Sequence, residues 1–150
     1  MRHSIAAALV CVGLAGCGQT ERPDQFNQNL KPGEVVSLIE DRALVFFDQG
    51  SAELNGGAVR VMDALKPAYW LHDAVLVEIT GHTDRTGSAA PNQLLSQRRA
   101  EAVRDALVAR GVREDILVIR GRGENDPLVP TDDGKAEPQN RRVDICARRS

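Results

Sequence analysis

The sequence lacks the marks of several large functional classes. Its 19 Lys and Arg are matched by 21 Asp and Glu, so it has no excess of positive charge with which to bind nucleic acid. The apolar run at residues 5–13 is too short to cross a bilayer, which needs about 20 apolar residues. The sequence also has no Gly-x-Ser-x-Gly elbow, no Cys-His pair and no signature pair of carboxylates, so hydrolysis is a weak interpretation.

Metal and nucleotide motifs are poorly represented too. His82 and Asp84 stand two residues apart on an extended segment, but no other His or Cys clusters with them, which makes a poor zinc site. Residues 121–124 (GRGE) follow a strand pattern, yet they lead into Asp126 and Pro127 and not into a helix, so they are no dinucleotide fingerprint. We therefore expect no metal and no cofactor.

The N-terminus has the pattern of an export signal. A short basic start precedes the apolar run, and residues 14–17 (LAGC) follow it, which predicts a signal peptide over residues 1–16. LAGC resembles a bacterial lipobox, and this resemblance implies that Cys17 is acylated and anchors the chain in a membrane without spanning it. Gly18 is not Asp, which by resemblance to lipoprotein sorting rules favours the outer membrane. The alternative is an ordinary secreted protein with an incidental cysteine.

The rest of the chain divides into a tether and one domain. Residues 17–34 are polar, with few apolar side chains to bury, so we expect a flexible tether. Residues 35–150 have the length of a single domain. Because Cys11 would leave with the signal and Cys17 would carry lipid, Cys146 would stand alone, and we expect no intramolecular disulfide.

The apolar periodicity of this domain predicts alternating strands and helices. Asn92 is the expected N-cap of the second helix, and Gly111 its stop. Pro67 should kink or end the first helix. The order β-α-β-α-β-β favours an α/β (α+β) two-layer sandwich, with a mixed sheet and both helices on one face. We predict strands at 43–47, 74–80, 116–119 and 143–146, and helices from 51 or 52 to 71 and over 92–110.

One charge interrupts the apolar stripe of the second helix. Arg99 lies four residues from both Leu95 and Val103, so it shares their buried face. A buried guanidinium requires a carboxylate, a solvent-filled cleft or a ligand. Arg98 falls on the opposite, polar face, where we expect it in solvent.

Asp84 follows the second predicted strand, at a sheet edge where binding crevices usually form. Together Asp84 and Arg99 could hold one ammonium and one carboxylate of a zwitterion. The simpler alternatives are that Asp84 is a turn residue and that Arg99 forms a structural ion pair with it.

Three segments in order resemble the OmpA-like peptidoglycan-binding domain, which is shared by OmpA C-terminal domains, the Pal lipoprotein and MotB. They are residues 81–87 (GHTDRTG), 92–100 (NQLLSQRRA) and 140–143 (NRRV), and the resemblance covers about 44–145. It implies the fold predicted above. It also implies that Asp84 and Arg99 grip meso-diaminopimelate, the diamino acid of the peptide stems in many bacterial walls.

The same resemblance implies a supporting pocket. Alternation places Arg141, and not Arg142, on the side of Val143 and Ile145, so we prefer Arg141 as the residue that faces the ligand. The supporting residues are Phe47, Asp48, Thr83, Asn92, Leu95, Asn140 and Arg141.

These observations predict a non-enzymatic outer-membrane lipoprotein whose domain faces the periplasm. Its expected partners are peptidoglycan peptide stems and, through Cys17, membrane lipid, so that it ties the membrane to the wall. One alternative is a Pal-like component of a Tol-type envelope complex, which acts mainly through protein partners. An alternative of another class is a periplasmic hydrolase of the wall.

Overall fold

A computed structural model describes residues 42–65, 74 and 76–148 of the 150-residue chain. Residues 1–41 lie outside the described ranges. They include the predicted signal peptide, the lipidation site at Cys17, the tether and the start of the predicted domain. Residues 66–71 of the first predicted helix, Pro67 among them, lie outside those ranges as well. Within the described ranges, no helix combines the length and the apolar character that crossing a membrane requires.

The described elements follow the predicted order of strands and helices. They are β1 (Arg42–Phe46), α1 (Gly56–Leu65), β2 (Leu76–Gly81), α3 (Ala89–Val108), β3 (Leu117–Gly121) and β4 (Arg142–Arg148). Two short 3-10 turns, Glu114–Ile116 and Pro138–Asn140, precede β3 and β4.

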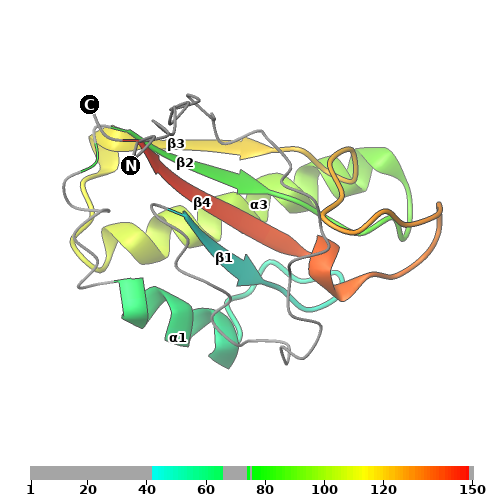
Figure 1. The fold of residues 1–150 in the computed structure, drawn as a ribbon, viewed down its shortest axis with the longest axis horizontal. Helices are drawn as coiled ribbons and strands as arrows, with labels where there is room; N and C mark the ends of the chain where they lie inside the picture. The colour runs from blue at the N-terminus through cyan, green and yellow to red at the C-terminus, as the bar shows by residue number, and fades with distance from the viewer. Residues whose placement is uncertain (1–41, 66–73, 75, 149–150) are drawn as a thin grey trace, which may run out of the picture.

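The strands form one mixed sheet in the order β1-β4-β2-β3 (Figure 1). β4 is antiparallel to both its neighbours, and β2 is parallel to β3. The register pairs Ile145 with Ala43 and with Ile79, so these side chains share one face of the sheet. That face joins α1 and α3 in a single apolar core, which confirms the predicted two-layer sandwich.

Both helices begin elsewhere than predicted. α1 starts at Gly56 and not at residue 51 or 52, because the side chain of Asn55 accepts the Ala58 N–H at 2.9 Å and caps the helix there. α3 starts at Ala89 after an extended Ser88, so Asn92 is not the N-cap and its side chain is free for other contacts. Gly111 follows the helix with φ +94°, a conformation that glycine adopts without strain, as its predicted role as a stop requires.

Cys146 differs from its predicted state. It lies in β4 and is 4% exposed, so it is buried as expected of a cysteine in a strand. However, it is disulfide-bonded, which contradicts the expectation that it stands alone. The expectation assumed that the only other cysteines, Cys11 and Cys17, are unavailable. The bond therefore belongs to the unprocessed chain and is incompatible with a mature protein that has lost Cys11 and is acylated at Cys17.

Two glycines bring α3 unusually close to the ends of β2 and β3. A Cβ added to Gly81 would lie 1.9 Å from the backbone oxygen of Ser96, and one added to Gly121 would lie 2.8 Å from the backbone nitrogen of Gln97. The hydroxyl of Ser96, in turn, accepts the N–H of Gly123 at 2.9 Å. The helix therefore rests on the strand ends themselves, and this approach places Arg99 over them.

Gly81→Ala should lower the free energy of unfolding by about 3 kcal/mol, since the added methyl meets backbone and α3 must shift. Chemical denaturation measures the change. The control is Gly56→Ala, where the new Cβ would meet only the flexible end of Arg60 at 3.7 Å. Equal stabilities of the two variants would contradict this account of the contact.

Candidate functional site

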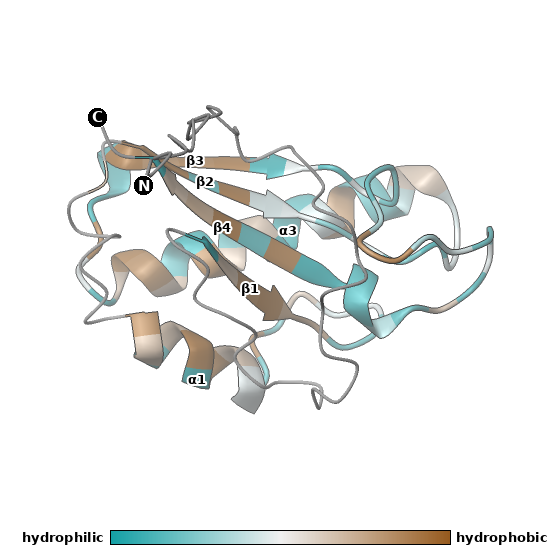
Figure 2. Ribbon diagram, viewed as in Figure 1, coloured by the Kyte–Doolittle hydropathy of each residue, from teal (hydrophilic) through white to brown (hydrophobic). Residues whose placement is uncertain are grey.

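The predicted site residues come together at one end of the sheet, where β1 and β2 end and β4 begins. There the N–H of Phe47 donates to the carbonyl of Arg141, and the N–H of His82 donates to the carbonyl of Arg142, each at 2.8 Å. Figure 2 shows polar colour concentrated along the loops at this end and apolar colour along β1 and the adjoining strand segments. Polar side chains therefore gather in the loops at this end of the sheet.

Arg99 is completely buried, as the interruption of the apolar stripe predicted. Its three nitrogens all donate to backbone carbonyls: Nε to Ser51 at 2.8 Å, Nη1 to His82 at 2.8 Å and Nη2 to Asp48 at 3.0 Å. It forms no direct ion pair with Asp84, so the simpler alternative of a structural ion pair does not hold here.

Two other features bear on the charge of Arg99. Its guanidinium lies 5.3 Å from the ring centroid of Phe47, an attractive cation–π arrangement. Burial lowers the pKa of Arg99 to about 10, while the negative charges of Asp84 and Asp48 act in the opposite direction. Arg99 therefore remains a cation at neutral pH.

Asp84 is buried as well, and four donors surround its carboxylate. Oδ1 accepts from the N–H of Thr86 at 3.2 Å and from its hydroxyl at 2.5 Å. Oδ2 accepts from Nη1 of Arg141 at 3.2 Å and from the N–H of Glu137 at 3.4 Å. Burial alone would raise the pKa of Asp84, but the bonds from Thr86, Arg141 and Glu137 outweigh it, and the pKa lies below its ordinary value.

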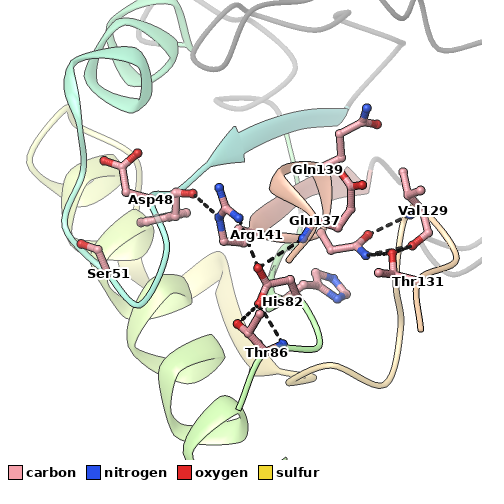
Figure 3. Close-up of polar contacts among 12 residues, drawn as sticks. Asp48, Ser51, His82, Thr86, Val129, Thr131, Glu137, Gln139 and Arg141 are labelled. Atoms are coloured by element: carbon pink, nitrogen blue, oxygen red, sulfur yellow. Dashed lines mark hydrogen bonds and ion pairs between the residues drawn. The ribbon is translucent and has the colours of Figure 1, made fainter. Parts of the chain in front are cut away.

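Arg141, which directly precedes β4, and Arg142, the first residue of β4, have different environments. Arg141 points into the site, where its Nε donates to the carbonyl of Phe47 at 3.2 Å and its Nη1 pairs with Asp84. Figure 3 shows it between Asp48 and the segment that carries His82 and Thr86. Arg142 instead pairs with Asp144 at 2.9 Å and is 3% exposed. Of the two, Arg141 is therefore the one that lies in the candidate site, and its contact with a ligand stays a prediction.

The other supporting residues shape the walls. Nδ2 of Asn92 donates to Glu124 at 2.6 Å and to the carbonyl of Thr86 at 2.9 Å. Asn140 holds the loop before β4 together through its hydrogen bonds to Val129 and Thr131.

Three predicted residues contribute less clearly to the walls. Thr83 is buried, and its hydroxyl has no hydrogen-bond partner within the described ranges. Leu95 is half-buried. The side chain of Asp48 is exposed and accepts from Asn55 at 3.3 Å, so the carbonyl of Asp48 is what serves Arg99.

Sequence reasoning missed three residues that hold the two charges. Ser51 supplies a carbonyl to Arg99, Thr86 supplies two donors to Asp84, and Glu137 supplies a backbone N–H. Thr86 was discoverable, because Asp followed two residues later by Thr is a common turn with this hydrogen bond. Backbone donors and acceptors such as those of Ser51 and Glu137 leave no signal in a sequence.

His82 is almost fully buried, and neither of its ring nitrogens has a hydrogen-bond partner among the residues that the structure describes. Its Nε2 is 3.7 Å from Oδ2 of Asp144. Burial, followed by the charge of Arg142, lowers the pKa of His82 to about 4, against the pull of Asp144. The described residues contain no group of three or more His, Cys, Asp and Glu placed to hold a metal ion.

A four-stranded mixed sheet with two helices on one face, and a buried carboxylate and guanidinium at the strand ends, define an OmpA-like α/β domain. The model of the OmpA family matches residues 46–141. The chain belongs to the OmpA family, which confirms the resemblance found in the sequence.

Individual relatives agree with this assignment. A peptidoglycan-associated lipoprotein of Rhizobium meliloti is 35% identical over 155 residues, covering 95% of this chain and 86% of that protein. One from Pasteurella multocida is 31% identical over 130 residues, covering 87% of each. The crystal structure of the peptidoglycan-associated lipoprotein from Burkholderia pseudomallei has a TM-score of 0.63 at 30% identity, over 70% of this chain and 89% of that one. The chain spans only 14% and 29% of the length of two larger relatives.

Protonation of His82 should make stability depend on pH. The folded pKa of about 4 is below the ordinary 6.5, so the unfolded chain binds the proton more readily. Stability is therefore full above about pH 6.5 and falls by on the order of 3 kcal/mol as the pH drops to 4. Denaturation of wild type and His82→Leu across this range tests the point. The free energy of unfolding of the variant should fall less than that of wild type between pH 6.5 and 4. Equal falls in both proteins would show that His82 titrates normally.

Proposed function

We propose that this protein is an envelope lipoprotein whose domain binds peptidoglycan non-covalently and ties the outer membrane to the wall. One observation carries the proposal: a buried cation, Arg99, and a buried anion, Asp84, lie within electrostatic range without a direct ion pair between them. Each is held in place by other groups, so both charges are positioned ahead of any ligand.

The side-chain end of meso-diaminopimelate fits these two charges. It carries one ammonium and one carboxylate on the same carbon. Asp84 is an acceptor for the ammonium, and the buried guanidinium of Arg99 adds a fixed positive charge that favours a carboxylate beside it. Each such bond contributes roughly 1.5 to 3 kcal/mol before the ligand is ordered, so a single site should bind only moderately.

The relatives support the class of ligand. Two that match most of this chain are named peptidoglycan-associated lipoproteins, and a structural neighbour has the same name. These names support a role in binding peptidoglycan and not in catalysis.

Anchoring and binding would reinforce each other in this protein. Acylation at Cys17 holds one end at the membrane, and the polar tether of residues 17–34 connects it to the domain. Linking two weak attachments raises the effective concentration of each for its site, provided the tether spans the gap. Many copies of the protein bound along one peptidoglycan polymer would then hold the outer membrane to the wall.

A second candidate role is binding to an envelope protein, for example of a Tol type. Leu94, on the first half of α3, is 62% exposed, and a large exposed apolar side chain near the site is suited to a protein contact. Hydrolysis of the wall has no comparable observation in its favour.

Co-sedimentation with purified sacculi tests the main proposal. Wild type should pellet with walls that contain diaminopimelate and not with walls that contain lysine in its place. Arg99→Lys should lose most of this binding, because one ammonium cannot replace a fork that meets three carbonyls. Arg98→Lys is the matched control, since Arg98 is exposed one position away and its replacement should change nothing.

Thermal unfolding of both variants separates loss of binding from loss of fold. Pelleting with both kinds of wall, or with neither, would reject diaminopimelate as the ligand. In the latter case a search for protein partners would follow.

Cys17→Ser should leave an unprocessed precursor, because lipobox processing requires a lipidated cysteine at that position. Mass spectrometry and metabolic labelling with a fatty acid read out processing and acylation. Recovery of a mature, soluble protein from this variant would mean that the signal is an ordinary secretory one.

A further inference from the structure

The two arginines of the site differ in what they can offer a ligand. Arg99 has no exposed surface, and each of its nitrogens already donates to a carbonyl. The side chain of Arg141 is 15% exposed, and its bonds use Nε and Nη1. Of its five N–H groups, the two on Nη2 therefore have no acceptor among the described residues. The accessible guanidinium edge belongs to Arg141.

The carboxylate of Asp84, by contrast, has no vacant position. A carboxylate accepts about four hydrogen bonds, and Asp84 already accepts four, two of them from Thr86. An incoming ammonium must displace a donor. The bonds to Oδ2, at 3.2 Å from Arg141 and 3.4 Å from Glu137, are longer than the 2.5 Å bond from the hydroxyl of Thr86. Of the two Oδ2 donors, Glu137 donates from its backbone, so Arg141 is the one that can turn away by rotating its side chain.

We propose that a ligand enters by an exchange of ion pairs at Arg141. The ammonium of the ligand replaces Arg141 on Asp84, and the guanidinium of Arg141 turns to the carboxylate of the ligand. The number of ion pairs rises by one, and no charge is left buried without a partner. Arg141 is thus a specificity-determining residue. In the free site it occupies the position of the ligand's ammonium, and in the complex it binds the ligand's carboxylate.

This inference rests on the proposed function and adds a consequence for selectivity. A lysine residue has the ammonium of diaminopimelate but lacks the adjacent carboxylate. In the free protein, Arg141 competes equally against both ammonium groups. In the complex, the displaced guanidinium of Arg141 gains a new ion pair only with diaminopimelate, because lysine has no carboxylate there. Arg141 should therefore weaken binding of lysine peptides, while for diaminopimelate peptides the new contact with the carboxylate offsets the cost of displacing it. Because that cost is the same for both peptides, the ratio of their Kd values reports the carboxylate contact.

Calorimetric titration of the full chain in detergent with two peptides measures this effect. The peptides are L-Ala–D-Glu–meso-diaminopimelate and L-Ala–D-Glu–L-Lys, and the readout is the ratio of their Kd values. Arg141→Gln should reduce this ratio by about tenfold or more, equivalent to one charge-assisted bond. The lysine peptide should bind the variant as well as wild type or better, because Asp84 is no longer occupied. Arg85→Gln is the control, since it removes an equal charge from a residue that pairs with the exposed Asp133 at 2.7 Å.

Other patterns overturn the exchange. A parallel loss of affinity for both peptides would make Arg141 a structural residue. A parallel gain would make it a mere competitor that never contacts the carboxylate. If wild type binds neither peptide, the proposed function itself fails, which is a separate result.

A second variant guards against misfolding of Arg141→Gln. Arg141→Lys keeps the charge near Asp84 but loses the fork, so the ratio of Kd values should still fall. An unchanged ratio in this variant would reject the exchange even if Arg141→Gln does not fold.

Discussion

The burial of the Arg99 guanidinium is the constraint on which the rest of the site depends. A cation without exposed surface must be compensated, and three backbone carbonyls do so here. Two of them lie in the loop after β1, and the third, that of His82, lies at the end of β2. One side chain from α3 therefore fastens two loops of different strands. The helix is close enough to do this because Gly81 and Gly121 present no side chains to it.

Two further charged side chains, Asp84 and Arg141, lie near the fixed guanidinium of Arg99. Asp84 is held as an anion by donors from three segments, and Arg141 reaches it from the start of β4. A helix, two loops and a strand thus build a site with two cations around one carboxylate. A ligand that brings both an ammonium and a carboxylate can enter without leaving any of these charges alone, and this charge pattern is what makes the proposed ligand chemically reasonable.

Much of this architecture was predictable, and the failures have identifiable causes. Alternation and helical periodicity gave the right element order, since they report which side chains are buried. The start of α1 was misplaced because residues 51–55 continue the apolar spacing but are held as a loop that serves Arg99. Asn92 resembles an N-cap in sequence, yet its amide binds Glu124 across the site. The state of Cys146 depended on residues distant in the chain.

The sequence by itself determined that one arginine lies on the buried face of a helix and that an aspartate follows a strand, because both facts depend only on local spacing. It also identified the family, since the order of three short segments is a property of the chain. Only the tertiary structure decided how Arg99 is neutralised and that Arg141 occupies Asp84. Those contacts join residues 17 to 57 positions apart, and several use backbone atoms, which are the same in every residue and so leave no trace in the sequence.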